Sequence, residues 1–66
     1  MRDTLKSGDL IEIFENNQWI QAKFLDYYNI LSVGIFYYTG EFSYLKKIND
    51  KVIAPFIEDG KWRISL

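Results

Sequence analysis

Aromatic side chains are the most numerous groups in this sequence that could recognise another molecule. The 66 residues include two tryptophans, five tyrosines and five phenylalanines. A large ring buries about 150–250 Å² when it is enclosed, so a domain of this length cannot enclose all of them. We expect the surplus to form a surface that docks a protein or peptide, although these rings could instead close the ends of the domain. The expected partner-binding residues are Trp19, Tyr27, Tyr28, Tyr38 and Phe42.

The basic side chains are concentrated in one stretch, at Lys46, Lys47 and Lys51. Beside aromatic rings such a patch could contact phosphates while bases stack on the rings, as in proteins that bind single-stranded nucleic acid. The whole chain, however, has eight Lys and Arg against nine Asp and Glu. This balance argues against binding held mainly by counterion release. Nucleic-acid binding is therefore the alternative function, and a solvated strand edge is the purely structural interpretation of the lysines.

The residue types that usually carry catalysis and metal binding are missing or unsuited. The sequence has no cysteine and no histidine, which removes disulfides, the usual metal ligands and acid–base catalysis by imidazole. The carboxylates Asp9, Glu12, Glu15 and Asp26 could gather at one end of the domain, but a catalytic pair needs a pocket that raises one pKa. We expect Asp9 to form a turn before the first strand instead. The sequence thus predicts no enzyme activity and no cofactor.

Length and hydropathy limit the organisation and the location of the chain. Sixty-six residues make one domain at most, over 1–66, and we expect 1–7 to be a loose N-terminal segment. No apolar run approaches the roughly 20 residues that span a bilayer, and the first residues lack the apolar core of a signal peptide. We therefore expect a cytoplasmic protein with no membrane partner. Its richness in Ile, Asn, Lys and Tyr resembles that of small regulatory or inhibitory proteins of AT-rich bacteria and their phages.

The elements that must position these residues are predicted to be short strands. Pairs of turn-forming residues recur at about the 8–12-residue spacing that is typical of a small all-β sandwich or barrel. The pairs are Gly8-Asp9, Asn16-Asn17, Tyr28-Asn29, Thr39-Gly40, Asn49-Asp50 and Asp59-Gly60. The β-branched and aromatic content favours strands over helices. Closing five or six such strands into a barrel removes exposed edges.

Two-residue periodicity predicts which side of each strand is buried. In the first two strands, expected over 10–14 and 19–26, the inward residues are Ile11, Ile13, Ile20, Ala22 and Phe24. The third strand, expected over 32–38, permits two phases. We prefer the phase that buries Val33, Ile35 and Tyr37 over the one that buries Gly34, Phe36 and Tyr38, because it places two β-branched residues inside. Gly34 within this strand indicates a bulge or a close approach of another backbone.

The second half of the chain is less regular. A fourth strand is expected over 42–45, and it loses its alternation at Tyr44-Leu45. Either a bulge or a single 3-10 turn near residues 45–49 would explain this loss. The fifth strand, over 52–57, contains Pro55, which cannot donate a ladder hydrogen bond, so this strand is an edge or is broken there. The last strand, over 61–66, is expected to follow a hairpin turn.

Three features follow one another along the first part of the chain. A Gly-Asp pair precedes the alternating strand of Gly8–Ile13, an apolar-x-Ala-x-apolar strand opens with tryptophan in Trp19–Phe24, and a strand ends in aromatics and a glycine turn in Phe36–Gly40. Together they resemble the Tudor/Agenet branch of the SH3-like barrels over about half of the chain. The resemblance implies a small five- or six-stranded SH3-like barrel.

The resemblance also implies a binding mode. In that family, aromatic side chains at one end of the barrel can form a cage for a methylated lysine or arginine, held by cation–π attraction of about 0.5–2 kcal/mol. Carried over by position, the cage would use Trp19 with Phe36 or Tyr38, and Tyr27 or Tyr28 from a loop. The expected function is therefore a non-catalytic module that binds a protein or peptide.

Overall fold

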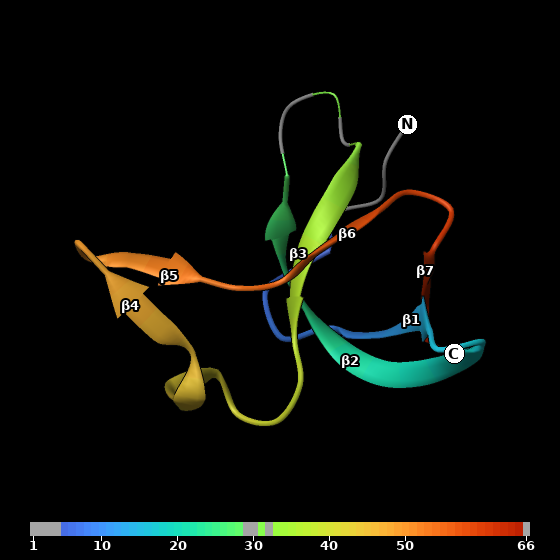
Figure 1. Ribbon diagram of the computed structural model, residues 1–66, viewed down its shortest axis with the longest axis horizontal. Helices are drawn as coiled ribbons and strands as arrows, with labels where there is room; N and C mark the ends of the chain where they lie inside the picture. Colours follow the sequence, from blue (N-terminus) through green and yellow to red (C-terminus); the bar gives the residue numbers. More distant parts are fainter. Residues whose placement is uncertain (1–4, 29–30, 32, 66) are drawn as a thin grey trace.

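The computed structural model describes residues 5–28, 31 and 33–65, and this part of the chain is built mainly of β-strands (Figure 1). One antiparallel sheet has the strand order β6-β3-β2-β1-β7. Its strands, in chain order, are β1 (Leu10–Glu15), β2 (Gln18–Tyr27), β3 (Gly34–Tyr38), β6 (Phe56–Glu58) and β7 (Trp62–Ile64). A second, two-stranded sheet pairs β4 (Lys46–Ile48) with β5 (Lys51–Ile53). None of the described residues belongs to a helix long and apolar enough to cross a membrane.

The five-stranded sheet curls into a half-barrel, which confirms the all-β class and is compatible with an SH3-like barrel. Strands β6 and β7 lie at opposite ends of the strand order, yet only a short link between Glu58 and Trp62 joins them. The Lys61 N–H closes this link by donating to the Glu58 carbonyl at 3.2 Å, with Gly60 at a φ of 91°. The turn is therefore present, but the expected hairpin is wrong, because its flanking strands pair with β3 and β1 instead of with each other.

Two other turns have the conformation that their residues favour. Asn16 and Asn17, between β1 and β2, have φ angles of 53° and 62°. Asn49 and Asp50, between β4 and β5, have φ angles of 51° and 64°. A two-residue type I′ hairpin turn needs positive φ at both positions, which Asn and Asp tolerate better than other residues with a Cβ. Both predicted turns are confirmed.

The core fills the inside of the curl. Its fully buried members are Ile11, Ile13, Ala22, Phe24 and Ile35. Ile20 and Tyr37 are partly buried and pack against this cluster, so the inward faces predicted for the first two strands are confirmed. In the third strand Ile35 is fully buried and Tyr37 packs against the core, as the preferred phase requires. Val33 is 46% exposed because it precedes β3, and Tyr38 of the other phase is buried.

The second half differs from expectation in the position of its 3-10 turn. This turn, η1, spans Phe42–Tyr44, where a fourth strand was expected, and residues 46–48 form β4. The Asn49-Asp50 turn explains the difference, since it folds the lysine-rich segment back onto β5 as a hairpin. Pro55 breaks the expected fifth strand into β5 and β6, as predicted. Ser32 and Leu66, which the expected strands also included, lie outside the described residues.

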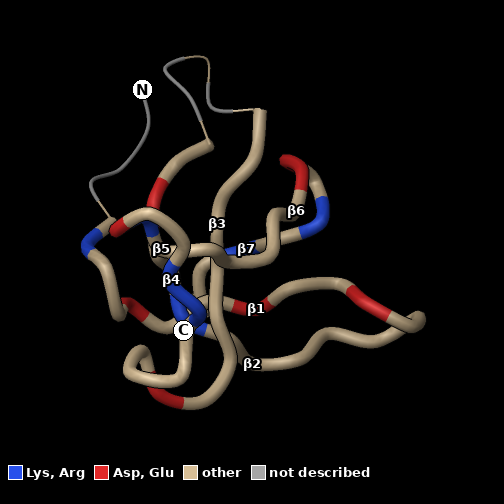
Figure 2. Tube along the Cα trace, turned by 60° about the vertical axis from the view of Figure 1, so that its left-hand side comes forward, with Lys and Arg blue, Asp and Glu red and all other residues tan. Residues whose placement is uncertain are grey.

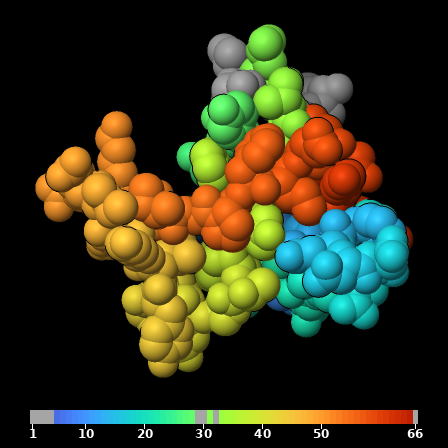
Figure 3. Space-filling view, viewed as in Figure 1, coloured from blue at the N-terminus to red at the C-terminus, as the bar shows by residue number. Residues whose placement is uncertain are grey.

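The β4–β5 hairpin stands apart from the half-barrel. No residue of either strand is buried, and the two strands contact each other far more than they contact the main sheet. Figure 2 shows lysines along β4, and Figure 3 shows the hairpin projecting from one end of the molecule. The fold thus places its basic segment on an arm.

The segment before β1 is fastened by Asp9. The Asp9 carboxylate accepts a hydrogen bond from the Lys6 N–H at 2.8 Å, and the Lys6 carbonyl accepts one from the Asp9 N–H at 2.9 Å. Leu5 packs against the core from this segment. Asp9 therefore has the turn-forming role that was expected, while residues 1–4 of the expected loose segment lie outside the described residues.

Candidate functional site

The structure divides the predicted aromatic residues among separate places. Trp19 packs against Phe14 near the β1–β2 turn, with 5.2 Å between ring centroids. Tyr38 and Phe42 pack edge-on at 5.6 Å, and Tyr38 is buried while Phe42 is exposed. Tyr28, just after β2, belongs to a third group. The five residues therefore do not form one continuous binding surface.

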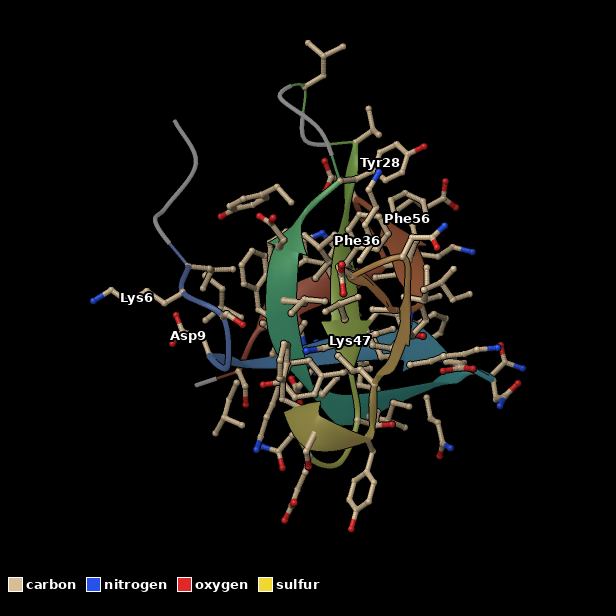
Figure 4. All side chains as sticks on the ribbon, turned by 90° about the vertical axis from the view of Figure 1, so that its left-hand side faces the viewer. Lys6, Asp9, Tyr28, Phe36, Lys47 and Phe56 are labelled. Carbon is tan, nitrogen blue, oxygen red and sulfur yellow. The ribbon has the colours of Figure 1, made fainter. Side chains whose placement is uncertain are left out.

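Tyr28 joins two rings from other strands in what we call the outer aromatic cluster, Tyr28, Phe36 and Phe56. Its ring centroid lies 4.4 Å from that of Phe56 and 5.6 Å from that of Phe36, and the two phenylalanines are 6.0 Å apart. Tyr28 is 48% exposed and Phe56 is 42% exposed. Figure 4 shows the three side chains together beside β3. This cluster is the largest connected group of rings among the described residues.

Strand register places the cluster on the side of the sheet opposite the core. Phe36 pairs directly with Phe56, and the neighbouring pair is Ile35 with Ile57. Side chains alternate between faces along a strand, so the isoleucine pair points into the core and the phenylalanine pair points out. The core is thus complete without the cluster, and Tyr28 and Phe56 remain open to solvent.

Gly34 explains how the Phe56 ring can lie so close to β3. A Cβ at position 34 would overlap the Phe56 ring and the Ile57 carbonyl oxygen. The close backbone approach predicted for this glycine is confirmed. Absence of a side chain here lets Phe56 lie across the strand and reach Tyr28.

Tyr27 has a different role from its neighbour Tyr28. It packs edge-on against the buried ring of Phe24, with 4.9 Å between centroids, and is itself partly buried. The register between β2 and β3 shifts between Phe24 and Asp26. This bulge at Leu25 leaves Phe24 and Tyr27 on the core side. Tyr27 is therefore a core ring.

The face of the Trp19 ring is covered by a cation of the same chain, the guanidinium group of Arg63. The guanidinium carbon of Arg63 lies 3.9 Å from the centre of the Trp19 ring, within cation–π range. The Arg63 Nε also donates a 2.8 Å hydrogen bond to the Glu12 carboxylate. Neither Arg63 nor Phe14 belongs to the outer aromatic cluster. Trp19 therefore packs against Arg63 and Phe14. It does not join Phe36 or Tyr38, with which the expected cage would combine it.

A shallow hollow adjoins the outer aromatic cluster, between the sheet and the hairpin. It has a volume of about 310 Å³ and is lined by Leu25, Asp26, Phe36 and Val52. Lys47 is the cross-strand partner of Val52, so its side chain lies on the same face of the hairpin. The hollow thus combines apolar side chains with the Asp26 carboxylate, and Lys47 lies on the hairpin face that borders it.

A second hollow lies where the two edges of the curled sheet approach, and we call it the seam groove. It has a volume of about 340 Å³ and is lined by Phe14, Glu15, Tyr37, Phe56, Ile57, Glu58 and Lys61. Burial raises the pKa of the Tyr37 hydroxyl above its usual value, and the nearby Glu15 carboxylate adds to this effect. The Lys61 ammonium lies 3.8 Å from the Glu58 carboxylate. The groove therefore combines apolar side chains with two carboxylates and one ammonium group.

The three predicted lysines all lie on the hairpin. Within the part of the chain that the structure describes, Lys46, Lys47 and Lys51 take part in no ion pair. The four carboxylates considered for chemistry have separate roles: Asp9 forms its turn and Glu12 holds Arg63, whereas Glu15 lines the seam groove and Asp26 lines the hollow beside Phe36. No group of three acidic residues among residues 5–28, 31 and 33–65 could hold a metal ion.

Sequence reasoning identified Tyr28 but omitted Phe56 and considered Phe36 only for a cage. Phe56 follows Pro55 in a strand whose pairing partner could not be known from the sequence. The sequence did contain a signal for Phe56, because each of these two strands carries a phenylalanine next to an isoleucine, Phe56-Ile57 and Ile35-Phe36. The register of β6 on β3 pairs the two phenylalanines directly and the two isoleucines directly.

Comparison with known proteins gives no family for the chain: no family model, curated protein or solved structure matches it. Function is therefore inferred from the outer aromatic cluster, the seam groove and the hairpin themselves.

Proposed function

We propose that this protein is a non-catalytic binding module that recognises a protein or peptide through the outer aromatic cluster. The observation that carries the proposal is the convergence of Tyr28, Phe36 and Phe56 on the side of the sheet that the core does not use. Aromatic side chains offer large, rigid contact area at low conformational entropy cost. They are also frequent among the residues that dominate binding energy.

The surroundings of the cluster define the ligand further. The rings touch one another, which leaves no space for an ammonium group between them, so a ligand lies over the ring faces. The hollow beside Phe36 accepts an apolar side chain, and Asp26 at its rim favours a basic neighbour on the ligand. The Tudor/Agenet resemblance supports a methylated lysine or arginine as that neighbour. A regulatory or inhibitory role in a bacterial or phage cytoplasm suits so small a module.

Peptide selection and amide-shift mapping test this proposal. Peptides selected from a displayed random library should shift the backbone resonances of Tyr28, Phe36 and Phe56 in the labelled protein. Tyr28→Ala should weaken binding at least tenfold, because truncating a central interface ring costs about 2 kcal/mol or more. Tyr44→Ala is the matched control, since Tyr44 is 82% exposed and lies outside the cluster. Equal affinity of wild type and Tyr28→Ala would contradict the proposal.

Nucleic-acid binding remains the second candidate because three lysines without ion pairs share one projecting hairpin. Phosphate contacts by Lys46, Lys47 and Lys51 would be strongest at low ionic strength. Gel-shift assays with single-stranded DNA, duplex DNA and RNA at low salt test it. Binding that disappears when the three lysines are changed to alanine would support this function, and absence of any shift at low salt would reject it.

A further inference from the structure

Charge is divided unequally between the hairpin and the rest of the molecule. Residues 46–53 carry three lysines and one aspartate, whereas the other described residues carry four Lys and Arg against seven Asp and Glu. Opposite charges attract over roughly 10 Å at an ionic strength of 0.1 M. The hairpin is therefore a basic arm on an acidic body (Figure 2).

The outward face of the hairpin combines this charge with apolar side chains. Lys46 pairs with Ile53, and Ile48 pairs with Lys51. Directly paired residues share a face, and Val52 lines the hollow on the other face. Ile48 is 46% exposed and Ile53 is 50% exposed. The outward face thus presents two isoleucines flanked by two lysines.

The seam groove has the complementary arrangement. Phe14, Phe56 and Ile57 provide apolar surface, and the carboxylates of Glu15 and Glu58 are both exposed. Lys61 offsets part of this charge through its 3.8 Å contact with Glu58. One carboxylate remains in excess in the groove. A basic, branched aliphatic segment is therefore the kind of occupant that the groove fits.

Within one copy the two surfaces do not meet. No residue of the hairpin lines the seam groove. In Figure 3 the hairpin projects from one end of the molecule, while the β1–β2 turn beside the groove lies at the other. A contact between them therefore requires a second molecule.

We propose that the seam groove of one copy binds the outward face of the β4–β5 hairpin of a second copy. Ile48 and Ile53 pack against Phe14, Phe56 and Ile57, and Lys46 and Lys51 approach the Glu15 and Glu58 carboxylates. A two-fold dimer makes this contact twice. The doubling is needed because one hairpin offers little area, whereas stable interfaces bury about 1,200–2,000 Å². The contact shares Phe56 with the proposed ligand surface but uses neither Tyr28 nor Phe36, so a substitution at Tyr28 tests the ligand surface alone.

Light scattering coupled to gel filtration gives the first test. At low salt the mass of the wild-type chain should rise with concentration from 7.9 kDa towards twice that value. Added salt should reduce the association, because it screens exposed charges. Tyr28→Ala should associate like wild type, which separates this contact from the proposed function. A chain that stays monomeric at every concentration and salt level would overturn the proposal.

A charge-exchange experiment identifies the surfaces. One variant carries Lys46→Glu and Lys51→Glu, and the other carries Glu15→Lys and Glu58→Lys. All four side chains are exposed, and amide spectra verify that both variants fold. Each variant alone should remain monomeric, whereas an equal mixture should associate because each hairpin again meets a groove of opposite charge. Association of either variant alone at the wild-type level would overturn the proposal, as would a monomeric wild type whose hairpin resonances respond only to nucleic acid.

Discussion

The curled sheet and the β4–β5 hairpin begin from similar local chemistry and reach different environments. Both the β1–β2 hairpin and the β4–β5 hairpin turn through two residues with positive φ, Asn16-Asn17 in one and Asn49-Asp50 in the other. Ile11 and Ile13 of β1 are 0% exposed, yet neither strand of the β4–β5 hairpin has a buried residue. Turn chemistry therefore makes a hairpin, but burial against other strands decides whether it belongs to the core.

This difference has consequences for local stability. An isolated two-stranded hairpin is marginally stable in water, and regions with little buried apolar surface open more readily than the core. The β4–β5 hairpin should therefore open without unfolding of the half-barrel. Such independence suits an arm that meets another molecule.

The largest loss of unfolding free energy is expected when an isoleucine of the curled sheet is changed to alanine, and the same change in the β4–β5 hairpin is the comparison. Ile13→Ala removes fully buried atoms and should cost about 2–5 kcal/mol, which approaches the whole stability of a domain this small. Ile53→Ala affects a half-exposed side chain and should cost less than about 1 kcal/mol. Urea unfolding measures both. Equal destabilisation by the two variants would mean that the hairpin is part of the core.

A smaller effect is expected at Gly34, where the sheet meets the outer aromatic cluster. Gly34→Ala places a Cβ against the Phe56 ring and the Ile57 carbonyl, and overpacking of this kind costs about 1–3 kcal/mol. The ring of Phe56 should move away from Tyr28, which aromatic chemical shifts would report. Thermal unfolding gives the stability change. Unchanged stability together with unchanged Tyr28 shifts would refute the close approach.

Turn substitutions distinguish the two hairpins by a few tenths of a kcal/mol. Glycine adopts positive φ without the steric cost of a Cβ, so Asn17→Gly and Asp50→Gly should each favour its own turn. Asn17→Gly should raise the melting temperature of the whole domain. Asp50→Gly should slow hydrogen exchange only at the amides of β4 and β5. A global rise in melting temperature with Asp50→Gly would indicate that the hairpin unfolds together with the sheet.

The smallest effect concerns Tyr37 in the seam groove, at alkaline pH. Its pKa is raised in the folded protein, mainly by burial and further by Glu15. The folded state then holds this proton more tightly than the unfolded state, so the stabilisation is complete below pH 10 and is lost as the pH rises through the folded pKa. Tyr37→Phe should flatten the decline in unfolding free energy above about pH 10. Identical declines in both proteins would contradict the shift.

Prediction from the sequence worked best where alternation and turn residues agree. The core positions of β1 and β2 and the break at Pro55 followed from local pattern. The prediction of a strand over 42–45 was wrong because Phe42–Tyr44 form the short 3-10 turn η1. The predicted burial of Val33 was wrong because β3 begins one residue later, at Gly34. Local propensity does not determine where a strand begins when its partner lies far away in the chain.

By itself, the sequence determined the all-β character, the positions of the type I′ turns and the isoleucines that form the centre of the core. These features depend on neighbouring residues and on the two-residue period of a strand. Only the tertiary structure decided which rings meet. Alternation assigns a ring to a face, but Tyr28, Phe36 and Phe56 come together through the register of β6 on β3 and the curl of the sheet. Register and curl arise from long-range pairing, which no local pattern contains.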